Sequence, residues 1–509
     1  MNITLLCGDQ QNIVTAAEGE SLLEVIRKQN DLPVHSPCGG AGTCRKCTVW
    51  LVNESGEEAV LACRTPAQDG MTVRLPGAAP LMVELCDHLH SMTCASDSEA
   101  GYGIACDIGT TTVVCHLVNL STGARLATVG EGNAQRSYGG DVIARIKASM
   151  DGQRPALTSA IRGQLARMVE ALCRETGIAP DQISAMAVAA NTTMCHLLIG
   201  LAPDSIGVAP FTPLSRFGTE MDARELGLPF EGTVYIAPAV SGYVGGDITA
   251  DILAAELDKN EKPVLLVDIG TNGEMALGCG ERFLCCSTAA GPAFEGAQIC
   301  CGMTAAPGAI SRVDWDDGEL KCTVLGDGEA VGLCGSALVD GVAVMLELGV
   351  LDETGRILEE DEIPQEGLPY LIEVDGQPAF RLTDKVFITQ SDVRKLQLGK
   401  GAIAAGLQVL MNACNLDCSE VAELLLAGGF GSYIRPESAA RIGLIPAELL
   451  PVTRAIGNSA AFGAQMALVS REVKQRLTAL QNNMEYLELS GLPEFNDAYL
   501  EAMMFPETE

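Results

Sequence analysis

Basic residues are scarce in this sequence relative to acidic ones, and long apolar runs are missing. The 509 residues include 33 Lys and Arg against 66 Asp and Glu, giving a formal net charge of −33 at pH 7. Because such a charge repels phosphate backbones and anionic lipid surfaces, it disfavours nucleic-acid and membrane-surface partners. No apolar run reaches the roughly 18 residues needed to cross a bilayer, and the first residues lack a basic secretory leader. We therefore expect a cytoplasmic protein.

The length excludes a single ordinary core, because domains usually contain about 100 to 200 residues. Three or four units are the starting expectation. The composition, with 47% hydrophobic residues, 55 glycines and 19% charged residues, is typical of compact globular domains rather than disordered chains.

The sequence contains 20 cysteines, and in a reducing cytosol we interpret them as metal ligands or small core residues rather than disulfides. Four of them stand in the pattern C-x5-C-x2-C-x15-C, namely Cys38, Cys44, Cys47 and Cys63. The glycines between the first two allow the backbone to approach cluster sulfurs closely. Structural zinc is the alternative, although zinc sites typically use two CxxC pairs and this run has one.

The region around these cysteines is predicted to be rich in strands, at residues 3–6, 12–15, 48–52 and 71–75, with a short helix capped by Ser21. It resembles the β-grasp [2Fe-2S] ferredoxin domain over residues 1–80. The plant-type spacing is C-x4-C-x2-C, so the first loop here is one residue longer. His35 as a Rieske-type ligand is an alternative that four available cysteines disfavour. Residues 81–100 are predicted to be a linker, or else to dock through a helix at 81–92.

Two later segments share the pattern Asp-Ile-Gly-Thr after an apolar strand. The first contains Asp107, Gly109, Thr110 and Thr111, and the second contains Asp268, Gly270, Thr271 and Asn272. A tight hairpin of this composition offers backbone N–H groups and hydroxyls to phosphate oxygens, while the aspartate holds Mg²⁺ or its waters. Two copies make a structural turn a weaker explanation than it would be for one.

A third loop, containing Gly428 and Gly429, follows another apolar strand, where missing side chains let the backbone pack on a flat adenosine. In this order the three loops resemble the phosphate-1, phosphate-2 and adenosine motifs of the actin, sugar kinase and Hsp70 superfamily, over residues 101–470. The resemblance implies ATP and Mg²⁺ as ligands. Asp247 is the candidate for positioning the attacking water or Mg²⁺, with a plain helix N-cap as the alternative.

Finer motifs narrow the resemblance further. Residues 191–194, 242–247, 268–274, 287–296 and 389–394 are similar to those of reductive activators of corrinoid proteins, and so is 141–146. An upstream Asn-Ala-Gln at Asn133 departs from that family's usual Asn-Pro-Gln. The family reduces Co(II) corrinoid to Co(I) using ATP, which implies a corrinoid protein and an electron-donating reductase or ferredoxin as partners. In this resemblance Ser287 becomes a candidate for placing a hydroxyl near the cobalt, and a turn near the nucleotide is the alternative.

We therefore predict a multidomain protein, with a β-grasp ferredoxin domain followed by an α/β, RNase H-like, two-lobed ATPase of the actin type. The expected units are a ferredoxin-like domain at 1–80, a linker at 81–100, lobes at 101–205 and 206–470, and a helical tail at 471–509. The predicted catalytic residues are Asp247, Asp268 and Ser287. A homodimer stays open. The rival functions are a small-molecule kinase, a radical-dehydratase activator and a nucleotide-switched redox sensor.

Overall fold

The computed structural model describes residues 1–8, 10–29, 34, 36, 38–42, 46–53, 56–76, 94–98, 100–279, 282–431 and 433–507. Cys44 and His35 lie outside the described residues, as does the alternative of a helix at 81–92. Among the residues that are described, no helix is long and apolar enough to span a membrane.

The amino-terminal domain is a five-stranded sheet in the order β2-β1-β5-β3-β4 with one helix packed on it. Its elements are β1 (Asn2–Cys7), β2 (Gln10–Thr15), α1 (Leu22–Arg27), β3 (Thr48–Asn53), β4 (Gly56–Leu61) and β5 (Thr72–Arg74). The four predicted strands are confirmed, and Ser21 begins α1 through a capping box with Glu24. Strand β4 was not predicted, because most of its residues are exposed at the sheet edge and give no apolar pattern.

The first lobe is built on a six-stranded sheet in the order β10-β11-β9-β6-β7-β8. Its strands are β6 (Tyr102–Ile108), β7 (Thr112–Asn119), β8 (Arg125–Gly132), β9 (Ile183–Ala190), β10 (Thr219–Asp222) and β11 (Thr233–Ile236). The lobe boundary expected at residue 206 falls inside this unit, because β11 pairs in parallel with β9 and β10 pairs with β11. Pairing across the sheet therefore extends the first lobe past that position.

The second lobe has its own six-stranded sheet, in the order β22-β21-β12-β13-β14-β23. These strands are β12 (Val264–Ile269), β13 (Gly273–Cys279), β14 (Arg282–Thr288), β21 (Glu423–Ala427), β22 (Thr453–Gly457) and β23 (Met484–Tyr486). The helical tail expected at 471–509 begins with α11 (Arg471–Asn483), but this helix ends at Asn483 and the chain then forms β23. Parallel pairing of β23 with β14 makes part of the expected helical tail a sheet edge.

Two three-stranded sheets are attached to the second lobe. They contain β15 (Ala309–Asp316), β16 (Glu319–Val324) and β17 (Gly332–Leu333), and β18 (Leu371–Val374), β19 (Gln377–Arg381) and β20 (Phe387–Thr389). The helices of the two lobes are α2 (Val142–Ala148), α3 (Arg154–Thr176), α4 (Thr192–Ile199), α5 (Gly246–Ala254), α6 (Gly335–Glu347), α7 (Gln390–Ala413), α8 (Gly428–Gly431), α9 (Pro436–Arg441), α10 (Ser459–Val469), α11 (Arg471–Asn483) and α12 (Pro493–Ala502). Helix α3 ends at Gly177, which has the left-handed conformation that is common for glycine after a helix.

Helices α5 and α10 lie between the two large sheets and join them into one core. That core contains residues of both sheets together with apolar residues of the two helices. The helices pack so closely that a side chain added at Gly463 of α10 would come within 2.3 Å of the Ala250 carbonyl oxygen of α5. The loops at the ends of the two sheets therefore meet between the two lobes, where Thr111 contacts Glu295 and Asn458 contacts Asp107. This region between the lobes is called the cleft below.

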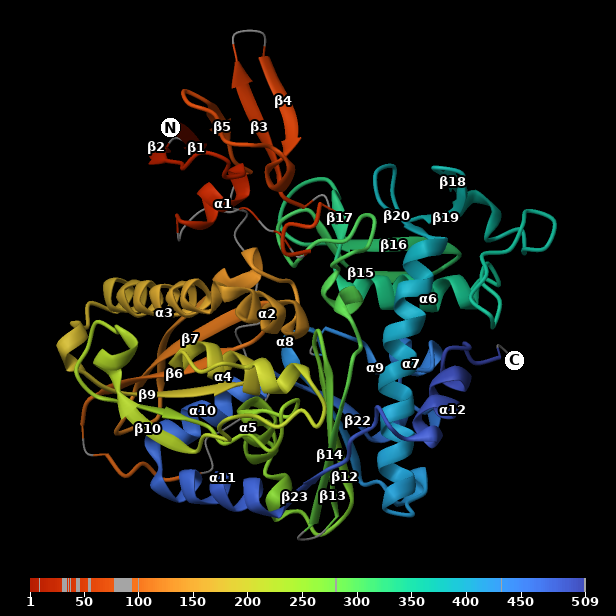
Figure 1. Cartoon of the computed structure of the whole chain (residues 1–509). Coiled ribbons are helices and arrows are strands. Elements are labelled where there is room, and N and C mark those ends of the chain that lie inside the picture. The colour runs from red at the N-terminus through yellow and green to blue at the C-terminus, as the bar shows by residue number, and fades with distance from the viewer. Residues whose placement is uncertain are drawn as a thin grey trace.

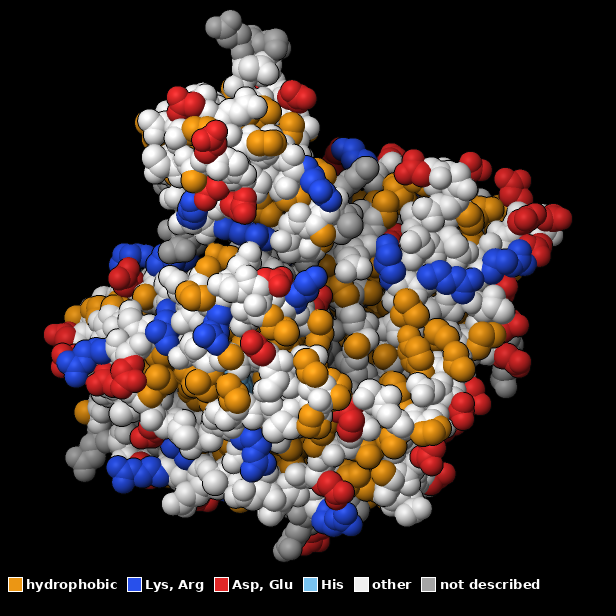
Figure 2. Space-filling view, in the orientation of Figure 1, with side chains coloured by type: hydrophobic (Ala, Val, Ile, Leu, Met, Phe, Trp, Pro, Cys, Tyr) orange, Lys and Arg blue, Asp and Glu red, His pale blue; other side chains and the backbone are white. Residues whose placement is uncertain are grey.

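The amino-terminal domain stands above the first lobe, near α2 and α3 (Figure 1). A contact between the two involves Arg27, whose guanidinium carbon lies 5.2 Å from the centre of the Tyr138 ring. On the face shown in Figure 2, Lys and Arg side chains gather around this junction, although the protein as a whole is acidic.

Candidate functional site

The two Asp-Ile-Gly-Thr segments form equivalent hairpin turns in the two lobes. The first joins β6 to β7 and the second joins β12 to β13, each pair being antiparallel. Asp107 and Asp268 stand near the ends of β6 and β12. In the second turn the Gly270 amide donates to the Asn272 carbonyl oxygen at 3.0 Å, which closes the loop tightly.

Glu295 connects the two turns across the cleft. It ends a short 3₁₀ helix, Pro292–Glu295, that follows β14 in the second lobe. Its carboxylate accepts a hydrogen bond from the hydroxyl of Thr111, and another from the Thr271 hydroxyl at 2.5 Å. The Glu295 side chain is buried. The structure therefore brings together the phosphate loops that the sequence predicted, through a residue whose role it did not predict.

Buried carboxylates surround the turns. Burial raises the pKa of Asp107 to about 7, against the opposing effect of the hydrogen bond that Asn458 Nδ2 donates at 2.9 Å. Burial also raises the pKa of Asp268, and the charges of Asp247 and Asp107 raise it further. Buried carboxylates that repel one another in a low-dielectric environment form an arrangement that a bound cation would stabilise.

Asp247 lies in the first turn of α5, but it is not the N-cap of that helix. The N-cap position belongs to Gly245, and one Asp247 oxygen accepts a hydrogen bond from the Ile248 amide at 2.9 Å. A side chain added at Gly245 would meet the Cα of Asn191 at 2.5 Å, so these two predicted motifs are in contact. Burial raises the pKa of Asp247, as it does for the other carboxylates of the cleft.

Ser287 lies on β14, directly across from Glu274 on β13, and Glu274 in turn lies across from Asp268 on β12. Side chains at directly paired positions project from the same face of a sheet. The three residues therefore form a row, and Ser287 belongs to the same face as the cleft carboxylates.

The predicted adenosine loop approaches the phosphate-2 loop. Gly428 has a φ of +88°, and a side chain there would come within 2.2 Å of an Asp268 carboxylate oxygen. No other residue type fits this position without displacing Asp268. The neighbouring Gly429 has open space where a side chain would project, which suits a loop that packs against a flat ligand.

The sequence predicted no role for two residues of the site. Arg145 lies within one of the motifs named above, and Asn458 lies outside all of them. Arg145 is fully buried, and its guanidinium donates to the carbonyl oxygens of Gly139, at 3.0 Å, and of Thr110 in the phosphate-1 loop. Asn458 caps α10 and donates to Asp107. An arginine within a family motif is a signal that could have pointed to Arg145. No such signal exists for Asn458, because it is separated from Asp107 by most of the chain.

Three of the four predicted cluster ligands are described. Cys47 Sγ and Cys63 Sγ are 3.3 Å apart, while two sulfurs bound to one tetrahedral metal at about 2.3 Å lie roughly 3.8 Å apart. Burial and the neighbouring Cys47 and Cys38 raise the pKa of Cys63 to about 11. These thiols therefore fit a metal cluster, whose positive charge would favour the thiolate form.

The cleft also fits Mg²⁺. Among the residues described, no three His, Cys, Asp or Glu side chains are arranged to hold a metal ion directly. Mg²⁺ usually binds through one or two carboxylates together with phosphate oxygens and waters, so it needs no such triplet. Asp107 and Asp268 are the carboxylates that the two turns make available for such an arrangement.

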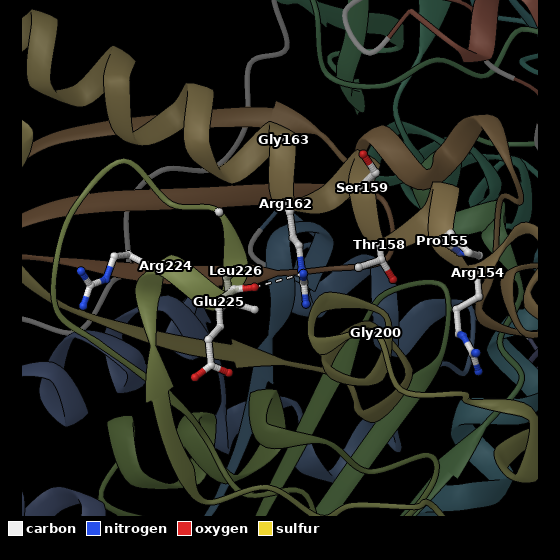
Figure 3. Close-up of a pocket in the computed structure, with 11 residues that line it drawn as sticks. Arg154, Pro155, Thr158, Ser159, Arg162, Gly163, Gly200, Arg224, Glu225 and Leu226 are labelled. Atoms are coloured by element: carbon white, nitrogen blue, oxygen red, sulfur yellow. Dashed lines mark hydrogen bonds between the residues drawn. The ribbon is translucent and has the colours of Figure 1, made fainter.

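A separate cavity of about 700 Å³ lies against α3 in the first lobe and contains none of the predicted site residues (Figure 3). Three arginines line it, but two of them already have partners there. Arg162 donates to the carbonyl oxygens of Leu198 and Glu225, and Arg224 is paired with Asp222 and Glu231.

Models of three protein families match consecutive parts of the chain. A model described as a 2Fe-2S iron-sulfur cluster binding domain matches residues 6–68, one described as the RACo middle region matches 102–260, and one described as the C-terminal domain of RACo, the ASKHA domain, matches 262–509. The fold class predicted from the sequence is thereby confirmed. The protein combines a [2Fe-2S] cluster-binding domain with a nucleotide-binding domain of the actin-like superfamily.

Known proteins extend this match over the whole chain. A corrinoid activation enzyme, RamQ, of Eubacterium limosum is 31% identical, with 96% of each chain covered. A Methanosarcina barkeri protein named as the reductase of a Co(II) methylated amine-specific corrinoid protein is 25% identical over 78% of this chain and 76% of its own. The solved structure of a reductive activator for a corrinoid, iron-sulfur protein has a TM-score of 0.73 at 29% identity, covering 100% of this chain and 99% of its own. The chain belongs to the family of corrinoid activation enzymes.

Proposed function

We propose that this protein reactivates a corrinoid protein by ATP-dependent transfer of one electron, converting Co(II) to the methyl-accepting Co(I) state. The observation that carries the proposal is the meeting of both phosphate loops in a cleft of buried carboxylates, in a chain whose first domain belongs to a [2Fe-2S] family. The relatives' names agree with it and do not favour a small-molecule kinase or a redox sensor.

The cluster site consists of Cys38, Cys44, Cys47 and Cys63 in this proposal. A [2Fe-2S] cluster bound there supplies a one-electron carrier. An external reductase or ferredoxin is the proposed electron source. The surrounding chain holds the cluster loop in place, since Arg27 donates to the Gly39 carbonyl oxygen at 3.1 Å and Arg64 to that of Ala41 at 2.5 Å.

The nucleotide site uses the paired loops. Gly109, Thr110 and Thr111 in one lobe, with Gly270, Thr271 and Asn272 in the other, offer donors to the phosphates. Asp107 and Asp268 hold Mg²⁺, Asp247 orients the attacking water, and Gly428 and Gly429 pack on the adenosine. Ser287 is a candidate catalytic residue, and its place in the row with Glu274 and Asp268 favours action on the nucleotide side of the cleft.

In this proposal, nucleotide hydrolysis supplies free energy for an unfavourable electron transfer. If the cobalt couple lies about 0.3 V below the electron donor, one-electron transfer is uphill by roughly 7 kcal/mol, or about five decades in equilibrium constant. An electron carrier alone would leave the cobalt largely oxidised. Movement of the two lobes around ATP couples a favourable reaction to the unfavourable transfer.

The decisive experiment is a visible spectrum of a Co(II) corrinoid protein mixed anaerobically with this protein and a reductant, with and without Mg-ATP. We expect the Co(I) band only when nucleotide is present. The Cys63→Ser variant is expected to lose the effect, while Cys300→Ala, which changes an exposed cysteine outside the cluster motif, is expected to keep it. Equal Co(I) formation without ATP would contradict the proposal, and a Ser287→Ala variant with unchanged ATPase and reduction rates would remove Ser287 from it.

A further inference from the structure

The contact of Glu295 with both phosphate loops has a consequence for nucleotide binding. Each hydroxyl has one proton to donate, and here the protons of Thr111 and Thr271 go to the two oxygens of the Glu295 carboxylate. A hydroxyl that donates to Glu295 is not free to donate to a phosphate oxygen. The two hydroxyls come from opposite lobes, so the carboxylate also ties the lobes together.

The charge around Glu295 is that of an anion site. Burial raises the pKa of Glu295, while the hydrogen bonds from Thr111 and Thr271, and then the positive charges of Arg136 and Arg145, act in the opposite direction and favour the ionised carboxylate. Arg145 also donates to the Thr110 carbonyl oxygen, which fixes the phosphate-1 loop beside it. Two hydroxyl donors and two nearby guanidinium groups would serve a phosphate group equally well.

We propose that Glu295 is an internal substitute for a nucleotide phosphate, competing with the bound nucleotide for the hydroxyls of Thr111 and Thr271. Two anions cannot share these donors in a buried, low-dielectric cleft without strong repulsion. Nucleotide binding therefore displaces the carboxylate and breaks the tie between the lobes. The inference rests on the nucleotide site proposed above and adds a device by which nucleotide controls the cleft.

The first test measures binding of a fluorescent, non-hydrolysable ATP analogue with Mg²⁺ to the full chain. Glu295→Gln keeps the side-chain shape but removes the charge and leaves one carbonyl oxygen to accept from two hydroxyls. We expect this variant to bind the analogue about tenfold more tightly than the wild type. The control is Glu329→Gln, which removes an exposed negative charge paired with Lys385 and is expected to leave the dissociation constant unchanged.

A double-variant cycle tests whether the effect passes through the hydroxyls. In a Thr111→Val, Thr271→Val background the Glu295→Gln change is expected to lose most of its effect on the dissociation constant, because no shared donors remain. The same tightening in both backgrounds, or an unchanged or weaker affinity of the single Glu295→Gln variant, would overturn the proposal.

Hydrogen exchange of the unmodified protein provides a test that does not depend on the correct folding of a variant. Saturation with the analogue is expected to speed amide exchange at residues 293–297, as Glu295 is released, and to slow it at 109–112 and 270–273. Slower or unchanged exchange at 293–297 would refute the competition. A wild-type chain that binds no analogue would instead contradict the proposed function, so the two failures are distinguishable.

Discussion

Asp107 illustrates how burial of a single carboxylate makes the stability of the empty site depend on pH. Its pKa is raised from 3.8 to about 7 in the folded protein, so the folded state keeps a proton that the unfolded chain releases near pH 4. Because the folded state binds more protons between these values, the contribution of Asp107 to stability is present at low pH and is lost as pH rises from about 4 to 7.

We therefore expect Asp107→Asn to stabilise the protein at pH 8, without nucleotide or Mg²⁺, by on the order of 2 kcal/mol relative to its effect at pH 5. The measurement is urea unfolding at both pH values. Asp327→Asn, at an exposed loop position, is the control and should show no such difference. A stabilisation of equal size at the two pH values would show that removal of a buried charge is not its cause.

Arg145 shows the opposite case, in which a buried charge has enough partners. Burial lowers its pKa to about 9, so it stays charged at neutral pH. Besides the Gly139 and Thr110 carbonyl oxygens, it donates to Gln135 at 3.3 Å. The phosphate-1 loop is therefore fixed by hydrogen bonds from a buried, charged side chain.

At the scale of elements, the packing of α5 against α10 determines how the lobes meet. Both helices are almost entirely buried, and each faces strands of the large sheets. Asp247 near the start of α5 and Asn458 before α10 reach the cleft because the amino-terminal ends of both helices point to it. A change in the distance between these helices would alter the position of Asp247 relative to Asn458.

Gly463→Ala tests this close packing. The added methyl group would lie 2.3 Å from the Ala250 carbonyl oxygen, and because this atom belongs to the backbone it cannot move alone. We expect the free energy of unfolding to fall by about 2 kcal/mol, in spite of alanine's better helix propensity. Denaturant unfolding measures the loss, with Gly491→Ala, where a side chain has open space, as the control. Equal stability of the two variants would show that the helices separate without cost.

At the scale of the whole molecule, the net charge is −33, so the excess Asp and Glu side chains repel one another in the folded state. Salt screens that repulsion. We expect the melting temperature at pH 8 to rise by about 3 °C between 20 and 300 mM KCl, which corresponds to a modest change in stability. At pH 5, nearer the sequence pI of about 4.4, the same change in salt should have a much smaller effect. A melting temperature that is insensitive to salt at pH 8 would mean that local ion pairs already balance the charge.

Local sequence was sufficient wherever a structure depends on neighbouring residues. The capping box at Ser21, the helix stop at Gly177 and the strand leading to Asp268 all follow from patterns within a few residues. The same holds for the cysteine spacing and for the paired Asp-Ile-Gly-Thr turns, since a hairpin's shape depends on its own residues. The roles proposed for the site residues stay predictions.

Other features were decided only by tertiary structure. The first lobe extends past residue 206, β23 replaces the end of a helix, and Glu295 joins Thr111 to Thr271 across the cleft. Thr111 and Glu295 are 184 positions apart, and Asn458 and Asp107 are 351 apart. By itself the sequence determined which turns and caps this protein has, because these depend on short-range geometry. Which of them meet depends on how the two sheets pack around α5 and α10. A pattern of neighbouring residues carries no information about packing between segments that are far apart in the sequence.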